Sequence, residues 1–266
     1  MLTRSSTGVF SAAPTYVDVL LVTDRSGSMI TMGGGLLAGC EKFIKEHYDM
    51  AKSFNMTDGN YRLRIVSFDN IVEVLYDGNA TGFYESKSNS EAIKKGLEPR
   101  GTTRLYDTII EQIDEQTARV DDFKKGLHPS ILQLNPRIAV ICAVLTDGED
   151  NMSINRSRHV ASKIEAHIKN YEATCQFIAA NQNANVTGAR MGFPVETCLQ
   201  MDADPEHAAA AMECITSSCV RTISGESPHF LEYERTLSAS LVPNWRPNFG
   251  PLNEDEDEDE SQPLRM

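Results

Sequence analysis

The feature that most constrains the fold is an unbroken run of apolar residues at positions 138–145, Ile-Ala-Val-Ile-Cys-Ala-Val-Leu. A second, mostly apolar segment occupies positions 17–23. Runs of this length without polar alternation are typical of strands that are covered on both faces, as in the parallel sheets of α/β proteins. Each run leads into a turn that contains an aspartate, Asp24 in the first case and Asp147 in the second.

Strand-like and helix-like segments alternate along the chain. Short apolar or alternating runs predict strands at residues 17–23, 61–68, 71–76, 138–145, 174–180 and 196–201. Apolar residues at helical spacing predict helices at residues 36–51, 103–120, 160–168 and 205–223. The turn at residues 69–70 predicts a hairpin and hence one antiparallel edge strand. We therefore predict a doubly wound α/β domain at residues 15–223, with a mostly parallel sheet and helices on both faces.

Hydroxyl and carboxylate side chains gather at three of the predicted loops. Asp24, Ser26 and Ser28 lie in the turn after the first strand, Thr103 opens the second helix, and Asp147 follows the longest apolar run. Carboxyl ends of parallel strands share one edge of a sheet, and doubly wound folds bind ligands at that edge. All five side chains offer oxygen, which suits a hard divalent cation such as Mg²⁺ or Mn²⁺ rather than zinc.

The order and context of these five residues resemble the von Willebrand factor A domain family. The resemblance rests on Asp-Arg-Ser-Gly-Ser-Met from position 24, Gly-Thr-Thr-Arg-Leu from 101, Leu-Thr-Asp-Gly-Glu-Asp-Asn from 145 and Phe-Ile-Ala-Ala-Asn-Gln from 177. It covers residues 15–222 and is greater for intracellular and bacterial or phage-type members than for integrin inserted domains. In that family five such residues form the metal-ion-dependent adhesion site, and all five find a match here.

The resemblance implies a binding function rather than catalysis. In the family, the carboxylate of a partner's Asp or Glu completes the coordination sphere of the bound metal. The chain is therefore expected to be an intracellular adaptor or scaffold and not an enzyme. By analogy with intracellular relatives, its partner is expected to be an AAA-type ATPase or a multi-subunit assembly.

Two other functions remain open. The first is a Mg²⁺-dependent hydrolase or phosphotransferase with Asp24 as its nucleophile, although Asp-based phosphatases carry a second Asp where this chain has Ser26. The second is that the metal mainly makes the three loops rigid. Hydrolysis of a phosphoester would favour the first, and partner binding that survives EDTA would favour the second.

Composition limits the cellular setting. The chain has 266 residues and is 41% hydrophobic, enough to bury the core of one domain, and no apolar run is long enough to span a bilayer. Residues 1–14 contain no apolar block of the kind found in secretory signals, and we interpret them as a flexible N-terminus. The six cysteines lie mostly in apolar segments without any Cys-x-x-Cys pair, which indicates buried free thiols. We expect a soluble, cytoplasmic protein that does not bind membranes.

The net charge of −13 is concentrated near the C-terminus. Residues 254–260 are all acidic and carry −7, which leaves −6 for all the others. A net-negative chain without a basic stripe is a poor candidate for nucleic-acid binding. Residues 224–266 are interpreted as an extended C-terminal tail. Its acidic run is either a solvated segment that aids solubility or a ligand that reaches back to the metal site.

Other polar residues near the loops have more than one interpretation. Glu149 and Asp150 are expected to be solvated surface residues, with a role at the rim of the site as the alternative. Arg25 and Arg104 either attract an acidic partner or balance local negative charge. The six histidines show no metal-ligand spacing, and the glycines at 33–35 begin too far from the strand end for a dinucleotide-binding loop.

Overall fold

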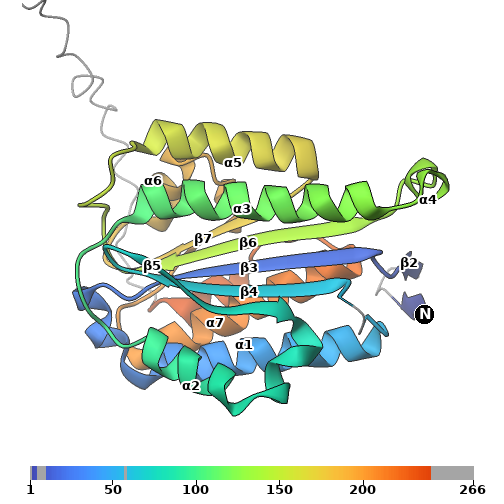
Figure 1. Cartoon of the computed structure of the whole chain (residues 1–266). Coiled ribbons are helices and arrows are strands. Elements are labelled where there is room, and N and C mark those ends of the chain that lie inside the picture. Colours follow the sequence, from blue (N-terminus) through green and yellow to red (C-terminus); the bar gives the residue numbers. More distant parts are fainter. Residues whose placement is uncertain (1, 5–9, 57–58, 241–266) are drawn as a thin grey trace, which may run out of the picture.

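The computed structural model describes residues 2–4, 10–56 and 59–240, and it is built around a six-stranded sheet (Figure 1). The strand order is β5-β4-β3-β6-β7-β8. The bounds are β3 Tyr16–Asp24, β4 Tyr61–Phe68, β5 Val72–Asn79, β6 Ile138–Thr146, β7 Thr174–Ala179 and β8 Cys198–Gln200. β5 pairs antiparallel with β4 at one edge, and the other neighbours pair parallel. The predicted fold class, a mostly parallel sheet with one antiparallel edge strand, is confirmed.

Helices cover both faces of this sheet (Figure 1). One face carries α1 (Gly33–Ser53), α2 (Lys87–Gly96) and α7 (Pro205–Ser224). The other carries α3 (Leu105–Gly126), α5 (Ser157–Tyr171) and α6 (Ala184–Arg190). The remaining short elements are β1 (Leu2–Arg4), β2 (Phe10–Ala12), α4 (Pro129–Gln133), α8 (Glu232–Ser238) and the 3₁₀ helices η1 (Gly27–Met32), η2 (Ala80–Glu85) and η3 (Val195–Thr197).

The two central strands explain why the apolar runs are unbroken. β3 and β6 pair along their whole length, from Tyr16 opposite Ile138 to Thr23 opposite Leu145. Successive side chains point into different hydrophobic cores on the two faces of the sheet. Leu21 packs with α1 and α7, whereas its neighbour Leu20 packs with α3 and α5. A strand buried on both faces has no solvent-facing positions, so its sequence does not alternate.

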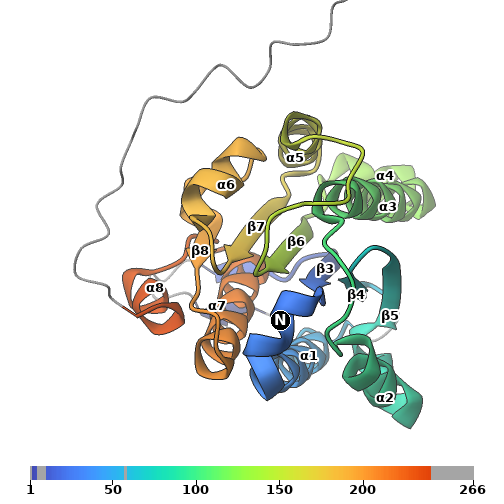
Figure 2. The same cartoon turned by 90° about the vertical axis from the view of Figure 1, so that its left-hand side faces the viewer.

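The glycines near the start of α1 allow close helix packing. A Cβ on Gly35 would lie 1.8 Å from the carbonyl oxygen of Pro205, and one on Gly39 would lie 2.5 Å from the Cβ of Met212. Both partners belong to α7, which lies beside α1 in Figure 2. These glycines therefore let two helices approach each other, in agreement with our rejection of a dinucleotide-binding loop.

Several elements differ from the sequence expectation. α3 begins at Leu105, so Thr103 lies in the loop before the helix rather than at its opening. The strand expected at residues 196–201 is split into η3 and the three-residue β8. α2 and α6 were not predicted. α2 buries only Ile93 and Gly96, which is too little apolar periodicity to reveal a helix.

The folded structure continues beyond residue 223. α8 packs against α7, Phe230 is buried, and the Ser238 hydroxyl donates a hydrogen bond to the Gln200 carbonyl (2.7 Å). Residues 224–240 of the predicted tail therefore cover the β8 edge of the domain. The acidic run and Trp245 lie outside the described residues. At the other end, β1 and β2 form a small antiparallel pair within residues 1–14.

All six cysteines are free and buried, as predicted. Within the described ranges, no helix combines the length and apolar character that crossing a membrane requires.

Candidate metal site

Three loops meet at the carboxyl edge of the sheet, which Figure 2 views from outside. Asp24 ends β3, and Ser26 and Ser28 follow it into η1. Asp147 follows β6, the neighbour of β3. Thr103 lies in the loop before α3, which is joined to the first loop by a hydrogen bond from the Gly27 amide to the Gly101 carbonyl (3.2 Å).

The predicted ligands lie close together. The Ser28 hydroxyl donates to Asp147 Oδ1 (2.7 Å), and Ser28 Oγ is 3.1 Å from Ser26 Oγ. Thr103 Oγ1 and Ser28 Oγ each lie 3.7 Å from the point that a Cβ on Gly148 would occupy. Glycine at position 148 thus leaves the space between the two hydroxyls open. We refer to Asp24, Ser26, Ser28, Thr103 and Asp147 as the five-oxygen site.

Asn151 holds Thr103 against the loop that carries Asp147. Its side-chain Oδ1 accepts a hydrogen bond from the Thr103 amide (2.9 Å), and its own amide donates to the Thr103 carbonyl (3.0 Å). This pair of bonds fixes the Thr103 backbone from both sides. Sequence reasoning assigned no role to Asn151, although it belongs to the motif that starts at Leu145.

The two carboxylates are buried, and one oxygen of Asp147 lacks a hydrogen-bond partner. Asp24 Oδ1 accepts from the Ser26 amide (2.6 Å) and Oδ2 from the Thr146 hydroxyl (2.7 Å). Burial, with a further contribution from the nearby Asp147, nevertheless raises the pKa of Asp24 to about 6. Burial also raises the pKa of Asp147. Its Oδ2 atom is buried and has no hydrogen-bond partner.

These features fit a hard divalent cation. An orphaned, buried carboxylate oxygen is costly unless a cation or a donor reaches it. A cation would offset the repulsion between Asp24 and Asp147 and would find neutral oxygens on Ser26, Ser28 and Thr103. Ser28 is exposed whereas the other four side chains are buried, so the site opens to solvent on one side.

Arg25 belongs to a buried network rather than to the rim of the site. It is 1% exposed, its Nη1 lies 2.7 Å from Glu73 Oε2, and its Nε lies 3.4 Å from Asp69 Oδ2. Of its two possible roles, the balance of local charge is the one that this geometry supports. Arg104, which immediately precedes α3, is partly exposed and pairs with Asp107 and Glu111 of that helix.

Asp69 links the first two ligand loops and was not predicted as a functional residue. Besides Arg25, its Oδ2 accepts a hydrogen bond from Arg100 Nε (2.7 Å), and its carbonyl accepts one from the Arg104 amide (2.9 Å). Burial alone would raise its pKa, but hydrogen bonds from the Ile71 amide and Arg100, together with the two guanidinium charges, lower it. Asp69 therefore stays ionised and holds the segment around Thr103 against Arg25.

Asp150 supports the loop after Asp147. Its carboxylate accepts hydrogen bonds from the Tyr106 amide (3.2 Å) and from the amide and hydroxyl of Ser153 (3.2 and 2.5 Å). The interpretation of Asp150 as a merely solvated residue is therefore wrong. Glu149 is exposed, as expected.

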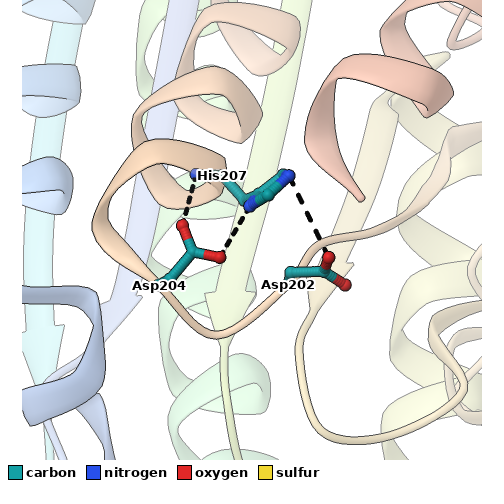
Figure 3. Close-up of side chains that lie close together, drawn as sticks. All are labelled: Asp202, Asp204 and His207. Atoms are coloured by element: carbon teal, nitrogen blue, oxygen red, sulfur yellow. Dashed lines mark hydrogen bonds and ion pairs between the residues drawn. The ribbon is translucent and has the colours of Figure 1, made fainter. Parts of the chain in front are cut away.

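A second acidic group, Asp202, Asp204 and His207, lies at the start of α7 (Figure 3), and we call it the capping cluster. Its potential ligand atoms lie within 4.8 Å of one another, an arrangement that can hold a metal ion. The histidines were predicted to show no metal-ligand spacing, and His207 is the one that the described structure brings beside two acids. The pattern was missed because Asp202 comes from the loop before the helix rather than from a helical repeat.

The hydrogen bonds of this cluster are those of a helix cap. Asp204 Oδ1 accepts from the amides of Glu206 and His207 (3.0 Å each), and Oδ2 lies 2.6 Å from His207 Nδ1. Asp202 Oδ2 accepts from the Ser240 amide (2.8 Å) and lies 4.0 Å from His207 Nε2. These bonds, of which Figure 3 draws those between Asp204 and His207, already engage oxygens that a metal would need.

Solved structures with this architecture belong to von Willebrand factor domains and related proteins. The vWF domain of the type V pili tip protein Mfa5 from Porphyromonas gingivalis aligns with a TM-score of 0.51 at 14% identity, over 80% of this chain and 97% of that one. The PilB minor pilin from Streptococcus sanguinis aligns at 0.50 and 14%, over 79% and 62%. A von Willebrand factor type A protein from Catenulispora acidiphila aligns at 0.47 and 18%, over 79% of this chain.

The alignments with the Mfa5 domain and with PilB, at TM-scores of 0.51 and 0.50, show that the chain has a von Willebrand factor A fold. This chain spans 43% of the length of the Catenulispora chain. No protein-family model matches the sequence, and no curated protein matches it either.

Proposed function

We propose that the chain is a divalent-metal-dependent protein-interaction module. In this proposal Asp24, Ser26, Ser28, Thr103 and Asp147 hold Mg²⁺ or Mn²⁺, and the cation accepts a carboxylate from a partner's Asp or Glu. The observation that carries it is the buried Asp147 Oδ2 without a partner, beside three hydroxyls from two other loops, Ser26 and Ser28 from one and Thr103 from the other.

The ligand set supports binding of an external anion. Three of the five ligands are neutral hydroxyls, and both Asp24 oxygens already accept hydrogen bonds. A cation held in this way keeps much of its attraction for a further oxygen ligand, and Mg²⁺ readily takes carboxylate oxygen. The exposed Ser28 marks the side from which that ligand would enter.

The partner and the location are part of the proposal. Because the motifs resemble intracellular and phage-type members, we propose an AAA-type ATPase or a multi-subunit assembly as the partner. Six buried free thiols support a reducing, cytoplasmic setting. The net charge of −13 argues against nucleic acid as the partner.

The geometry argues against the alternative of a hydrolase or phosphotransferase. A nucleophilic carboxylate needs an oxygen that is free to attack, but Asp24 is fully buried and both its oxygens accept hydrogen bonds. The binding proposal expects no hydrolysis of p-nitrophenyl phosphate in Mg²⁺. Turnover that disappears in Asp24→Asn would favour the enzyme instead.

The proposal can be tested by affinity capture from native lysate. Wild type, Asp147→Ala and Asp204→Ala would be compared in Mg²⁺ and in EDTA, with Asp204→Ala as the matched control because it removes an acid of the capping cluster at the same sheet edge. A specific partner should bind wild type and Asp204→Ala in Mg²⁺, and it should not bind Asp147→Ala or any sample in EDTA. Equal binding in EDTA would show that the metal only makes the loops rigid or is absent.

A further inference from the structure

We propose that the acidic run at residues 254–260 is an internal ligand of the five-oxygen site and competes there with the partner's carboxylate. The inference rests on the proposed function, because it requires a bound cation. Three observations carry it: the place where the described chain ends, the length of the intervening segment, and the sign of the charges.

The described chain ends at the same edge of the sheet as the five-oxygen site. The Ser240 amide donates to Asp202 Oδ2 (2.8 Å), and the Asp202 amide donates to the Ser238 carbonyl (3.0 Å). Asp202 lies just beyond the carboxyl end of β8, as Asp24 and Asp147 lie at the carboxyl ends of β3 and β6. Figure 2 shows α8 at this edge, beside β8 and α7.

The intervening segment is long enough. In the strand order β3-β6-β7-β8, β3 and β8 are three spacings of about 4.8 Å apart, or about 14 Å. Residues 241–253 are 13 residues, including three prolines. At about 3.1 Å per residue, such a segment spans up to about 40 Å in an extended conformation. Length therefore does not prevent contact between the run and the site, and there is room for a detour around the loops.

The charges make the contact depend on the metal. The run carries seven negative charges and the site contains two carboxylates, so without a cation the site repels the run. A bound divalent cation neutralises the two carboxylates and can itself accept a further carboxylate oxygen. The general repulsion between the run and the domain is screened beyond about 8 Å at physiological salt. A tethered ligand within reach has an effective concentration on the order of millimolar, so even a weak carboxylate–metal bond would be substantially occupied.

Competition can be measured without knowledge of the natural partner. The probe is a fluorescein-labelled peptide with the sequence of residues 254–260, and the readout is fluorescence anisotropy at physiological salt. The proteins are the full chain and a full-length variant in which the seven acids become amides, from Glu254→Gln and Asp255→Asn to Glu260→Gln. In Mg²⁺ the peptide should bind the amide variant about 3- to 10-fold more tightly than the full chain. In EDTA neither should bind.

A third protein separates the two proposals. Acidic runs bind divalent cations weakly by themselves, so Asp147→Ala with an intact tail measures that background. Calorimetry then compares the Mn²⁺ affinity of the wild type with that of Asp147→Ala. If the wild type binds Mn²⁺ no more tightly than this variant, the proposed function is wrong. If Mn²⁺ binds to the site and the peptide binds the full chain and the amide variant with equal affinity, the tail proposal is wrong and the proposed function stands. In that case the run is a solvated segment only.

Discussion

Two acidic clusters lie at the carboxyl edge of the same sheet, and their hydrogen bonding differs. In the capping cluster, Asp204 accepts two amide bonds from α7 and contacts His207, and Asp202 accepts the Ser240 amide. In the five-oxygen site, Asp147 Oδ2 is buried without any hydrogen-bond partner. The first cluster is complete without a ligand, whereas the second needs one more positive or donating group.

The pKa values of the acids show the same contrast. Hydrogen bonds from the His207 amide and side chain lower the pKa of Asp204. Burial raises the pKa of Asp24 to about 6 and also raises that of Asp147. Proximity of acids is therefore a poor guide to metal binding, because acids that cap a helix are already stabilised as anions. Buried acids whose ionised form is disfavoured gain the most from a cation.

The largest expected effect is the loss of metal affinity in the five-oxygen site. Asp24→Ala and Asp147→Ala should each weaken Mn²⁺ binding by at least about 100-fold, because each removes one of the two negative charges that hold the cation, a larger loss than the roughly 10- to 100-fold of a neutral outer-shell group. Asp204→Ala should change the affinity by less than about twofold. Isothermal calorimetry of the three variants checks this. The reverse ranking would assign the metal to the capping cluster.

The next effect is a pH dependence of stability in the metal-free protein. Because the pKa of Asp24 rises from 3.8 to about 6 on folding, its contribution is present below pH 3.8 and is lost as the pH rises through 6. Asp24→Asn lacks this titration, and Thr146 Oγ1 can then donate to the Gly148 carbonyl instead. Between pH 4 and 7 the wild type should lose about 2–3 kcal/mol relative to Asp24→Asn.

Urea unfolding of both proteins in EDTA at several pH values measures that difference. Saturating Mg²⁺ at pH 7 should then stabilise the wild type but not Asp24→Asn. If the difference in free energy of unfolding between the two proteins is the same at every pH, folding does not raise the pKa of Asp24. Asp24 and Asp204 would then not differ in the way proposed.

A smaller effect is expected at Asp69, which touches none of the five oxygens. Asp69→Asn removes the charge that holds Arg25 and Arg100 and should weaken Mn²⁺ binding about 10-fold through the loop that carries Thr103. The matched control is Asp77→Asn. Asp77 is an exposed residue of β5 that pairs with Arg62 and Arg64 of β4. Calorimetry should find the affinity of the control unchanged. Equal losses in both variants would indicate a general effect on folding.

The smallest effect is the loss of a helix cap. Asp204→Ala should lower the free energy of unfolding by about 1 kcal/mol, since it leaves two amides of the first turn of α7 without an acceptor. In a domain of this size that corresponds to roughly 2–4 °C in Tm. Differential scanning calorimetry in EDTA and in Mn²⁺ should give the same loss, whereas a loss confined to Mn²⁺ would indicate a metal at the cluster.

The sequence was sufficient to predict the fold, and it indicated that the five oxygen-bearing residues lie on loops at one edge of the sheet, because both depend on local patterns. Strands such as β6 are apolar throughout, and Asp24 and Asp147 directly follow such strands. Asp69 and Asn151 could not be found in this way, since they act through contacts with segments far away in the sequence. The capping cluster depends likewise on Ser240.

The most direct test of the central claim is the position of bound Mn²⁺ in crystals of the full chain, located by anomalous scattering. We expect a peak among the oxygens of Ser26, Ser28 and Asp147, and no peak between His207 and Asp202. A peak at His207 alone, or no peak beside Asp147 at a Mn²⁺ concentration that saturates binding in solution, would contradict it.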